Sequence, residues 1–176
     1  YRQIQSLMMG QTHGGHSWMI MGLGLDTFGQ TGGNSAFANW NNLNSSDGMV
    51  RHWYDNLYKL INRANTVIDM MDERTYITYS SAEKKAELRA TAVFFRAWSY
   101  RVLAGMYGNV PLLDHRATSI TTGYVPANRQ EVWEFCKEDF AYAAQNLPAK
   151  AEKPGQIVRA AADHYLAEVN LALGDF

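Results

Sequence analysis

A short segment of this chain places flat aromatic side chains beside several amides. Phe37, Asn39, Trp40, Asn41 and Asn42 lie almost side by side. Sugar rings present apolar C–H faces that stack on aromatic rings, and hydroxyl groups that bind amide side chains through hydrogen bonds. The segment therefore has the residue types of a carbohydrate-binding surface. The alternative is that Phe37 and Trp40 anchor a loop to the helices while the asparagines form turns, and the residues alone leave both interpretations open.

Hydrolysis of a glycosidic bond would need two carboxylates facing each other across a sugar-sized cleft, roughly 5 to 10 Å apart. The nearest candidates all fall in pairs on single predicted helices: Asp69 with Asp72, Glu83 with Glu87, and Glu138 with Asp139. Carboxylates that are neighbours on one helix typically form a solvated face or local ion pairs. No nucleophile elbow, phosphate loop or dinucleotide fingerprint occurs in the sequence. We therefore predict no catalytic residues and a protein that is not an enzyme.

Metal and thiol chemistry are also not predicted. His13 and His16 are spaced as a pair of metal ligands could be, but no third ligand lies near them in the sequence. Zinc sites normally use three or four ligands with supporting carboxylates, so we predict no metal and no cofactor. Cys136 is the only cysteine and cannot form an internal disulfide. With no histidine partner to activate it, we interpret Cys136 as a small buried side chain.

The composition is that of one folded domain. The chain has 176 residues, 47% of them hydrophobic, and a formal net charge of −1. Its basic residues are dispersed, which argues against nucleic acid and anionic membrane surfaces as partners. No apolar run is long enough to span a bilayer, and the amino end lacks the pattern of a secretory signal. Because the chain starts at Tyr1 and stops at a turn-like end, we expect it to be an internal fragment.

Four amphipathic helices are predicted. Apolar residues recur at helical spacing at Trp53, Leu57, Leu60, Ile61, Ala64, Val67, Ile68 and Met71. Ser46 or Asp47 would cap this helix, and a second would run over residues 81–107 until Gly108 ends it and Pro111 prevents continuation. The third is predicted over residues 129–146 and the fourth over residues 157–173. These helices form two antiparallel hairpins.

Alanines distributed along the predicted helices alternate with large aromatic residues, which is typical of tetratricopeptide-like repeats. We therefore predict an all-α fold of antiparallel hairpins of this repeat type. Glycines interrupt the first 48 residues, where we expect short helices over residues 1–9 and 18–25 and an ordered Gly/Asn/aromatic loop over residues 27–48. The single domain would divide into a loop-rich segment, 1–48, a first hairpin, 49–113, and a second hairpin, 114–176.

Arg96 lies in the middle of the second predicted helix, between Phe94–Phe95 and Ala97–Trp98. Part of its side chain must therefore lie against apolar surface, and a buried guanidinium needs a carboxylate or carbonyl partner. Asp139 on the third helix, or Asp69 and Asn65 on the first, could supply that partner. We predict a structural tie between the hairpins, in which Arg96, Asn65 and Asp139 hold the fold and bind no ligand.

Several segments resemble one family in the same order along the chain. The residues of the second helix and the stop after it match the SusD/RagB family, the surface glycan-binding lipoproteins of Bacteroidetes, at Glu87, Arg96, Ala97, Tyr107, Gly108, Val110, Pro111 and Leu112. The first helix is similar at Trp53, Tyr58, Ile61, Ala64, Asn65, Val67 and Ile68, and residues 129–148 and 155–176 are similar to the family's later helices. Asn109 stands where the family often has Asp, and Gln156 where it often has Arg.

The resemblance implies a tetratricopeptide-like amino-terminal part of an outer-membrane lipoprotein that binds glycan at the cell surface. It also implies a TonB-dependent, SusC-like transporter as a partner, to which the oligosaccharide is delivered in nutrient uptake. In the family, loops of the amino-terminal region contribute to the glycan platform, which points to Trp40 and its neighbours. Asp26 matches an acidic residue that the family often carries before this loop. The resemblance further implies Gly108 and Pro111 as structural residues, and an export signal and lipid anchor outside this chain.

A different function is compatible with composition and hairpin count alone. A helical-repeat adaptor could bind a peptide or protein partner in a concave groove. A groove of asparagine and basic residues would favour a peptide, whereas an exposed Trp40 among asparagines would favour a sugar.

Overall fold

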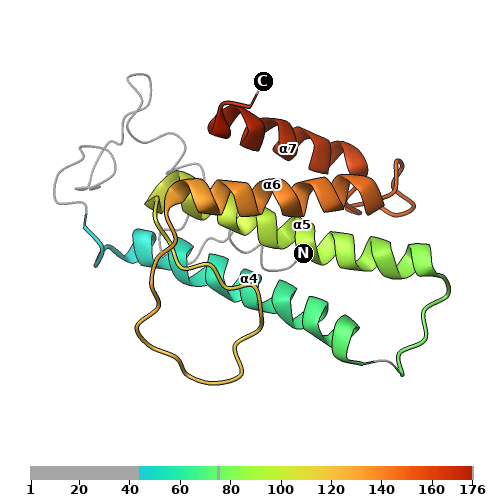
Figure 1. Ribbon diagram of the computed structural model, residues 1–176, viewed down its shortest axis with the longest axis horizontal. Helices are drawn as coiled ribbons and strands as arrows, with labels where there is room; N and C mark the ends of the chain where they lie inside the picture. The colour runs from blue at the N-terminus through green and yellow to red at the C-terminus, as the bar shows by residue number, and fades with distance from the viewer. Residues whose placement is uncertain (1–43, 75, 176) are drawn as a thin grey trace. The chain divides into compact units, whose positions relative to one another are not determined.

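The structure is a computed structural model that describes residues 44–74 and 76–175. Contacts divide the chain into residues 1–57 and residues 58–176, and each unit is described by itself. The helices are α4 (Gly48–Glu73), α5 (Ala82–Tyr107), α6 (Arg129–Asn146) and α7 (Arg159–Leu173). Successive helices run in opposite directions, so the predicted all-α fold of antiparallel hairpins is confirmed (Figure 1). Residues 1–43 lie outside the described residues. They include both helices expected over residues 1–9 and 18–25, and the part of the loop expected over residues 27–48 that precedes residue 44.

The first unit contains the beginning of α4. A turn leads into the helix, in which the Asn44 side chain accepts a hydrogen bond from the Ser46 amide at 2.8 Å and the Asn44 carbonyl accepts one from the Asp47 amide at 3.0 Å. Within the helix, Trp53 and Leu57 are buried. The division of the domain at residues 48 and 113 remains a prediction.

In the second unit, α5 is the central helix. Its residues 92–100 are all buried, because α4 contacts one side of it and the α6–α7 hairpin contacts the other. Ile68 of α4 packs with Ala92 and Val93 of α5, and Tyr142 of α6 packs against the same cluster. A helix covered on several sides no longer shows a single apolar stripe.

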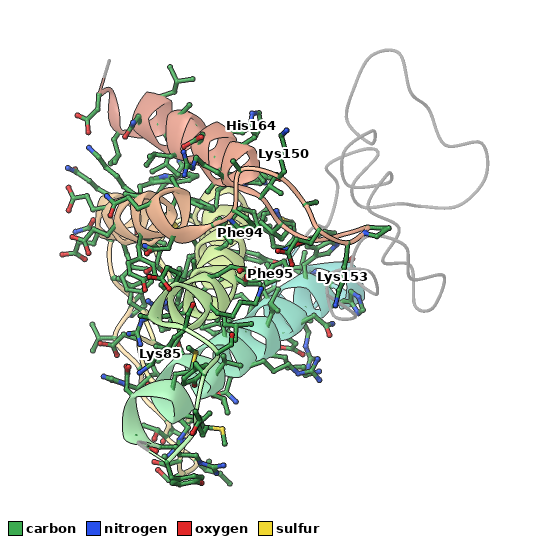
Figure 2. All side chains as sticks on the ribbon, turned by 90° about the vertical axis from the view of Figure 1, so that its right-hand side faces the viewer. Lys85, Phe94, Phe95, Lys150, Lys153 and His164 are labelled. Carbon is green, nitrogen blue, oxygen red and sulfur yellow. The ribbon has the colours of Figure 1, made fainter. Side chains whose placement is uncertain are left out.

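Aromatic contacts join three helices around Phe94 of α5. Its ring centroid lies 5.6 Å from that of Phe140 on α6 and 5.8 Å from that of Tyr165 on α7. Phe140 and Tyr165 stack on each other at 5.5 Å. Figure 2 shows Phe94 between these helices, whereas Lys150 and Lys153 lie on the connection between α6 and α7. Edge-to-face and stacked rings of this kind contribute packing area and a preferred geometry.

The ends of the helices follow their capping residues. The Ser81 side chain accepts a hydrogen bond from the Lys84 amide at the start of α5, and Asn128 forms a capping box with Glu131 at the start of α6. Gly108 ends α5 with a φ of 77°, a backbone conformation that favours glycine.

Two details differ from the sequence predictions. The fourth helix begins at Arg159, two residues later than predicted, because Val158 is extended and the Arg159 amide donates to the Pro148 carbonyl at 2.9 Å. Val67 was predicted on the buried face of the first helix, but it is 45% exposed because it lies at the edge of that face.

Candidate functional site

The residues predicted to bind glycan all lie in one part of the chain. Asp26, Phe37, Asn39, Trp40, Asn41 and Asn42 are outside the residues that the structure describes. Their role therefore remains a prediction, and the geometry that follows is that of the described residues alone.

The most strongly constrained polar group in this frame is Arg96. Its Nε and Nη2 atoms each donate to the Asp139 carboxylate at 2.8 Å, which joins α5 to α6. Its Nη1 atom donates to the Asn65 side chain of α4 at 3.0 Å and to the Asp114 carbonyl at 3.1 Å. The guanidinium carbon lies 4.9 Å from the centre of the Phe135 ring. Arg96 thus connects three helices and the chain that follows α5.

The environment of this pair decides its electrostatics. Arg96 and Asp139 are 9% and 8% exposed, and Asn65 is fully buried. Burial alone would lower the pKa of the Arg96 guanidinium, but its hydrogen bonds and charge interaction with Asp139 raise it. Burial raises the pKa of the Asp139 carboxyl, and the same two hydrogen bonds oppose that rise. A bidentate arginine pair in which each guanidinium nitrogen donates at least one hydrogen bond suits a structural tie, and that role remains to be tested by mutation.

Residues 110–117, which we call the strap, leave α5 and lie against α4 and α5 without forming a helix. Two tyrosines hold its first half. The Tyr58 hydroxyl donates to the Pro111 carbonyl at 2.8 Å. The Tyr100 hydroxyl accepts a hydrogen bond from the Leu113 amide at 2.6 Å and donates to the Leu113 carbonyl at 3.2 Å. Burial raises the pKa of Tyr100, so its hydroxyl keeps the proton that it donates.

Amides of α4 bind the main chain of the strap further along. The Asn65 Nδ2 atom donates to the Leu113 carbonyl at 2.7 Å and to the His115 carbonyl at 3.0 Å. The Asn62 Oδ1 atom accepts a hydrogen bond from the Ala117 amide at 2.8 Å. Asn65 therefore uses its oxygen for Arg96 and its nitrogen for the strap, which couples the two features through one buried side chain.

A charged cluster completes the contact between α4 and the strap. Asp69 accepts hydrogen bonds from the Arg116 amide at 2.8 Å and, at 3.0 Å, lies beside His115 Nδ1. The Arg116 guanidinium pairs with Glu73 at 2.7 Å. The hydrogen bond with Asp69 raises the pKa of His115. Burial alone would raise the pKa of Asp69, but its hydrogen bonds with Arg116 and His115 lower it below the usual value. Asp69, proposed as a partner for Arg96, thus binds the strap instead.

The sequence analysis named Asn65 and Asp69 only as possible partners of Arg96 and did not predict that α4 holds the strap. The residues that do so share one face of α4 at spacings of four, three, four and four residues: Tyr58, Asn62, Asn65, Asp69 and Glu73. This polar stripe lies next to the apolar one, and its period is the signal that could have revealed it.

The other candidates for chemistry have ordinary surroundings. Asp72 pairs with Arg89 at 2.5 Å and Glu87 with Lys84 at 2.7 Å, so these carboxylates are engaged locally. Among residues 44–74 and 76–175, no three potential ligands of the His, Cys, Asp or Glu type gather as a metal site. His13 and His16 lie outside those residues. Cys136 is buried, and burial raises the pKa of its thiol.

An open cavity of about 430 Å³ lies between the start of α6 and the end of α7. It is lined by Arg129, Gln130, Trp133, Ala172 and Leu173. None of the helices in the described part of the chain is long and apolar enough to cross a membrane.

Residues 24–171 match the sequence model of a SusD-like family described as "Starch-binding associating with outer membrane". The chain belongs to this SusD-like family. It is 31% identical over 120 residues to a SusD-like protein of Bacteroides ovatus, covering 68% of this chain and 22% of that protein. It is 28% identical over 138 residues to SusD-like protein P2 of Formosa agariphila, covering 76% and 26%. The chain therefore spans about a quarter of the length of these curated relatives.

Solved structures support the same fold. A SusD-like carbohydrate binding protein from Bacteroides fragilis is 25% identical, with a TM-score of 0.69 over 82% of this chain and 28% of that one. A protein crystallised with a xylogluco-oligosaccharide is 23% identical with a TM-score of 0.69, covering 78% and 26%. A laminarin binding SusD-like protein is 24% identical with a TM-score of 0.68, covering 79% and 30%. The resemblance to the SusD/RagB family is therefore confirmed. The description of the family names binding and no reaction, which agrees with the prediction that the protein is not an enzyme.

Proposed function

We propose that this chain is part of a non-catalytic glycan-binding protein at the bacterial outer membrane, which delivers oligosaccharide to a TonB-dependent, SusC-like transporter. The observation that carries the proposal is the match of residues 24–171 to a family described as starch-binding and associated with the outer membrane. This membership favours a glycan over the peptide partner of a helical-repeat adaptor.

We propose different roles for the helical part of the chain and for the segment that contains Trp40, based on the side chains in each. The helices and strap supply a frame with a buried ion pair and many main-chain hydrogen bonds. Trp40 and Phe37 would stack on sugar rings, while Asn39, Asn41 and Asn42 would bind hydroxyl groups and Asp26 would accept hydrogen bonds from them. Such binding needs no covalent step and no cofactor. The surface position and the lipid anchor belong to the same proposal.

The glycan is tested with full-length protein and defined oligosaccharides. Binding of maltoheptaose, a laminarin oligosaccharide and a xyloglucan oligosaccharide is measured by isothermal titration calorimetry. We expect at least one of them to bind, and Trp40→Ala to weaken that binding by about tenfold or more, equivalent to about 1.4 kcal/mol. Tyr76→Ala is the matched control, because Tyr76 is an aromatic residue that is 75% exposed and outside the predicted site.

Two results would contradict the proposal at different points. Binding that is unchanged in Trp40→Ala would exclude the predicted loop as the site while leaving the glycan function intact. A wild-type protein that binds none of the three oligosaccharides would contradict a glucan as the ligand. Delivery is tested separately, by whether the full-length protein co-purifies with a TonB-dependent transporter from detergent extracts of the cells that make both.

A further inference from the structure

One histidine lies between two carboxylates in the second half of the strap. The Nδ1 atom of His115 is 3.0 Å from the Asp69 carboxylate of α4, and its Nε2 atom is 3.9 Å from the carboxylate of Asp114, its neighbour in the chain. A neutral imidazole carries one N–H group, whereas an imidazolium carries two. Only the protonated ring can therefore direct an N–H group towards both carboxylates at once.

The charges around His115 favour a positive charge on its ring. Among the described residues, three carboxylates meet one arginine where α4 contacts the second half of the strap: Asp69, Glu73 and Asp114 with Arg116. The nearby Arg96 guanidinium already pairs with Asp139. A protonated His115 would be the second cation of this cluster, and the hydrogen bond with Asp69 is the main cause that raises its pKa.

The carboxylate that faces the histidine also holds the main chain of the strap. One oxygen of Asp69 lies beside the His115 ring, and the other accepts a hydrogen bond from the Arg116 amide at 2.8 Å. One residue further on, the Ala117 amide donates to the Asn62 side chain at 2.8 Å. The charge on the His115 ring therefore acts on the group that fixes this part of the strap to α4.

The first half of the strap is held by neutral groups. The Tyr58 hydroxyl donates to the Pro111 carbonyl, and the Tyr100 hydroxyl contacts both main-chain groups of Leu113. Burial raises the pKa of Tyr100, so its hydroxyl stays neutral over the range in which a histidine titrates. A change in the charge of His115 should therefore act on the second half of the strap and leave the first half in place.

We propose that His115 is a proton-dependent latch, which in its charged form holds residues 115–117 on α4 and in its neutral form lets them open locally more often. Because the pKa of His115 is raised by the fold, the stabilisation is fully present below the ordinary histidine pKa and is lost as the pH rises through the raised one. The pKa of Asp69 is lowered, so its carboxylate stays ionised throughout this range. The inference concerns the helical frame and does not depend on the proposed glycan function.

Hydrogen exchange at single amides of the full-length protein tests the latch. Exchange rates of the Arg116 and Ala117 amides are measured between about pH 5.5 and 8.5, and each is divided by the intrinsic rate of an unstructured peptide at the same pH. We expect the opening equilibrium of both amides to rise by about threefold to tenfold across this range. The Leu113 amide, which donates to the Tyr100 hydroxyl, is the internal control and should show no such rise.

Three results of this measurement would overturn the proposal. Opening of the Arg116 and Ala117 amides could be independent of pH, or it could decrease as the pH rises. An equal rise at Leu113 would show that the whole strap loosens, so that the effect does not arise at the contact with Asp69.

Two histidine variants assign the pH dependence to one group. In His115→Gln, the side chain can still donate to Asp69 but cannot take up a proton, so opening should no longer depend on pH. His164→Gln is the matched control, because His164 is an exposed histidine on α7, and this variant should keep the pH dependence of the wild type. A dependence that persists in His115→Gln, or one that disappears in His164→Gln, would assign the titration to another group and refute the latch.

Discussion

Replacing Arg96 by leucine should destabilise the fold more than any other single change at a charged residue described above. The substitution removes both hydrogen bonds to Asp139 and those to Asn65 and the Asp114 carbonyl. Leucine also lacks the volume of the arginine side chain, which lies over the Phe135 ring. The buried Asp139 carboxylate would be left without its cation.

The size of the loss in unfolding free energy depends on the buried groups that lose their partner when Arg96 is replaced. Removing one partner of a buried ion pair typically costs about 3–5 kcal/mol, because the other charge stays buried without compensation. Replacing both partners by apolar residues is often close to neutral for the same reason. The double variant Arg96→Leu/Asp139→Leu should therefore recover most of the loss. The remaining deficit would reflect Asn65, whose side-chain oxygen loses its donor at a fully buried position.

Urea unfolding of the full-length protein, followed by far-ultraviolet circular dichroism, measures these differences. Arg89→Leu is the matched control, because Arg89 also lies on α5 and pairs with Asp72 of α4, but these two side chains are 30% and 56% exposed. An exposed pair contributes about 0–1 kcal/mol, so the control should change stability little. Under conditions in which every variant is fully folded, glycan binding should be the same in all of them.

Two outcomes would refute this reasoning. A loss below about 1 kcal/mol for Arg96→Leu would show that the pair adds no more than a surface ion pair. Lost binding with unchanged unfolding would instead assign Arg96 a role at the ligand. A double variant no more stable than Arg96→Leu would show that the cost does not arise from the unpaired Asp139 carboxylate.

Three further predictions concern the strap and the end of α5. Tyr100→Phe should lower the unfolding free energy by about 1–2 kcal/mol, because a main-chain amide loses its acceptor; no loss would refute that contact. Gly108→Ala should destabilise by about 1 kcal/mol because φ is 77°, while Gly105→Ala, within α5, should stabilise by a similar amount; equal signs would contradict this. The Asp69–His115 contact should contribute most to the free energy of unfolding between about pH 4 and 6.5. Because the pKa of His115 is raised, the contribution is lost as the pH rises above this range and the imidazole loses its proton. Because the pKa of Asp69 is lowered, the contribution is also lost as the pH falls below this range and the carboxylate gains a proton. In NMR titrations, Asp69→Asn should lower the His115 pKa towards 6.5.

The helices were predictable because their signals are local. Ser81 and Asn128 cap the helices that follow them, and Gly108 ends α5, where each residue type acts through its own backbone. The start of α7 was placed two residues too early, because Val158 precedes the helix without a side-chain capping bond, so no capping residue marks the start in the sequence.

The sequence limited the candidate partners of Arg96 to three residues but could not select among them. Burial beside aromatic residues required a carboxylate or carbonyl, and Asp139, Asp69 and Asn65 were all at suitable places on neighbouring helices. The structure shows Asp139 and Asn65 at the guanidinium and Asp69 at the strap. Rotation of α4 about its axis decides this choice, and that rotation depends on the packing of the whole apolar face. The glycan residues lie outside the described part of the chain, so that prediction rests on chemistry and family alone.

The strap explains why α4 carries a polar stripe beside its apolar one. An extended segment against helices has main-chain groups that no helix can pair, and buried groups of this kind must find other partners. Side chains of α4 and α5 take the place of a neighbouring strand, through Asn65, Tyr58 and Tyr100 in particular. Because these contacts reach the main chain of the strap, its own side chains are freer to vary than the helical residues that bind it. The same reasoning accounts for residues 118–126, which are exposed and follow Ala117, the last residue of the strap that a side chain of α4 binds.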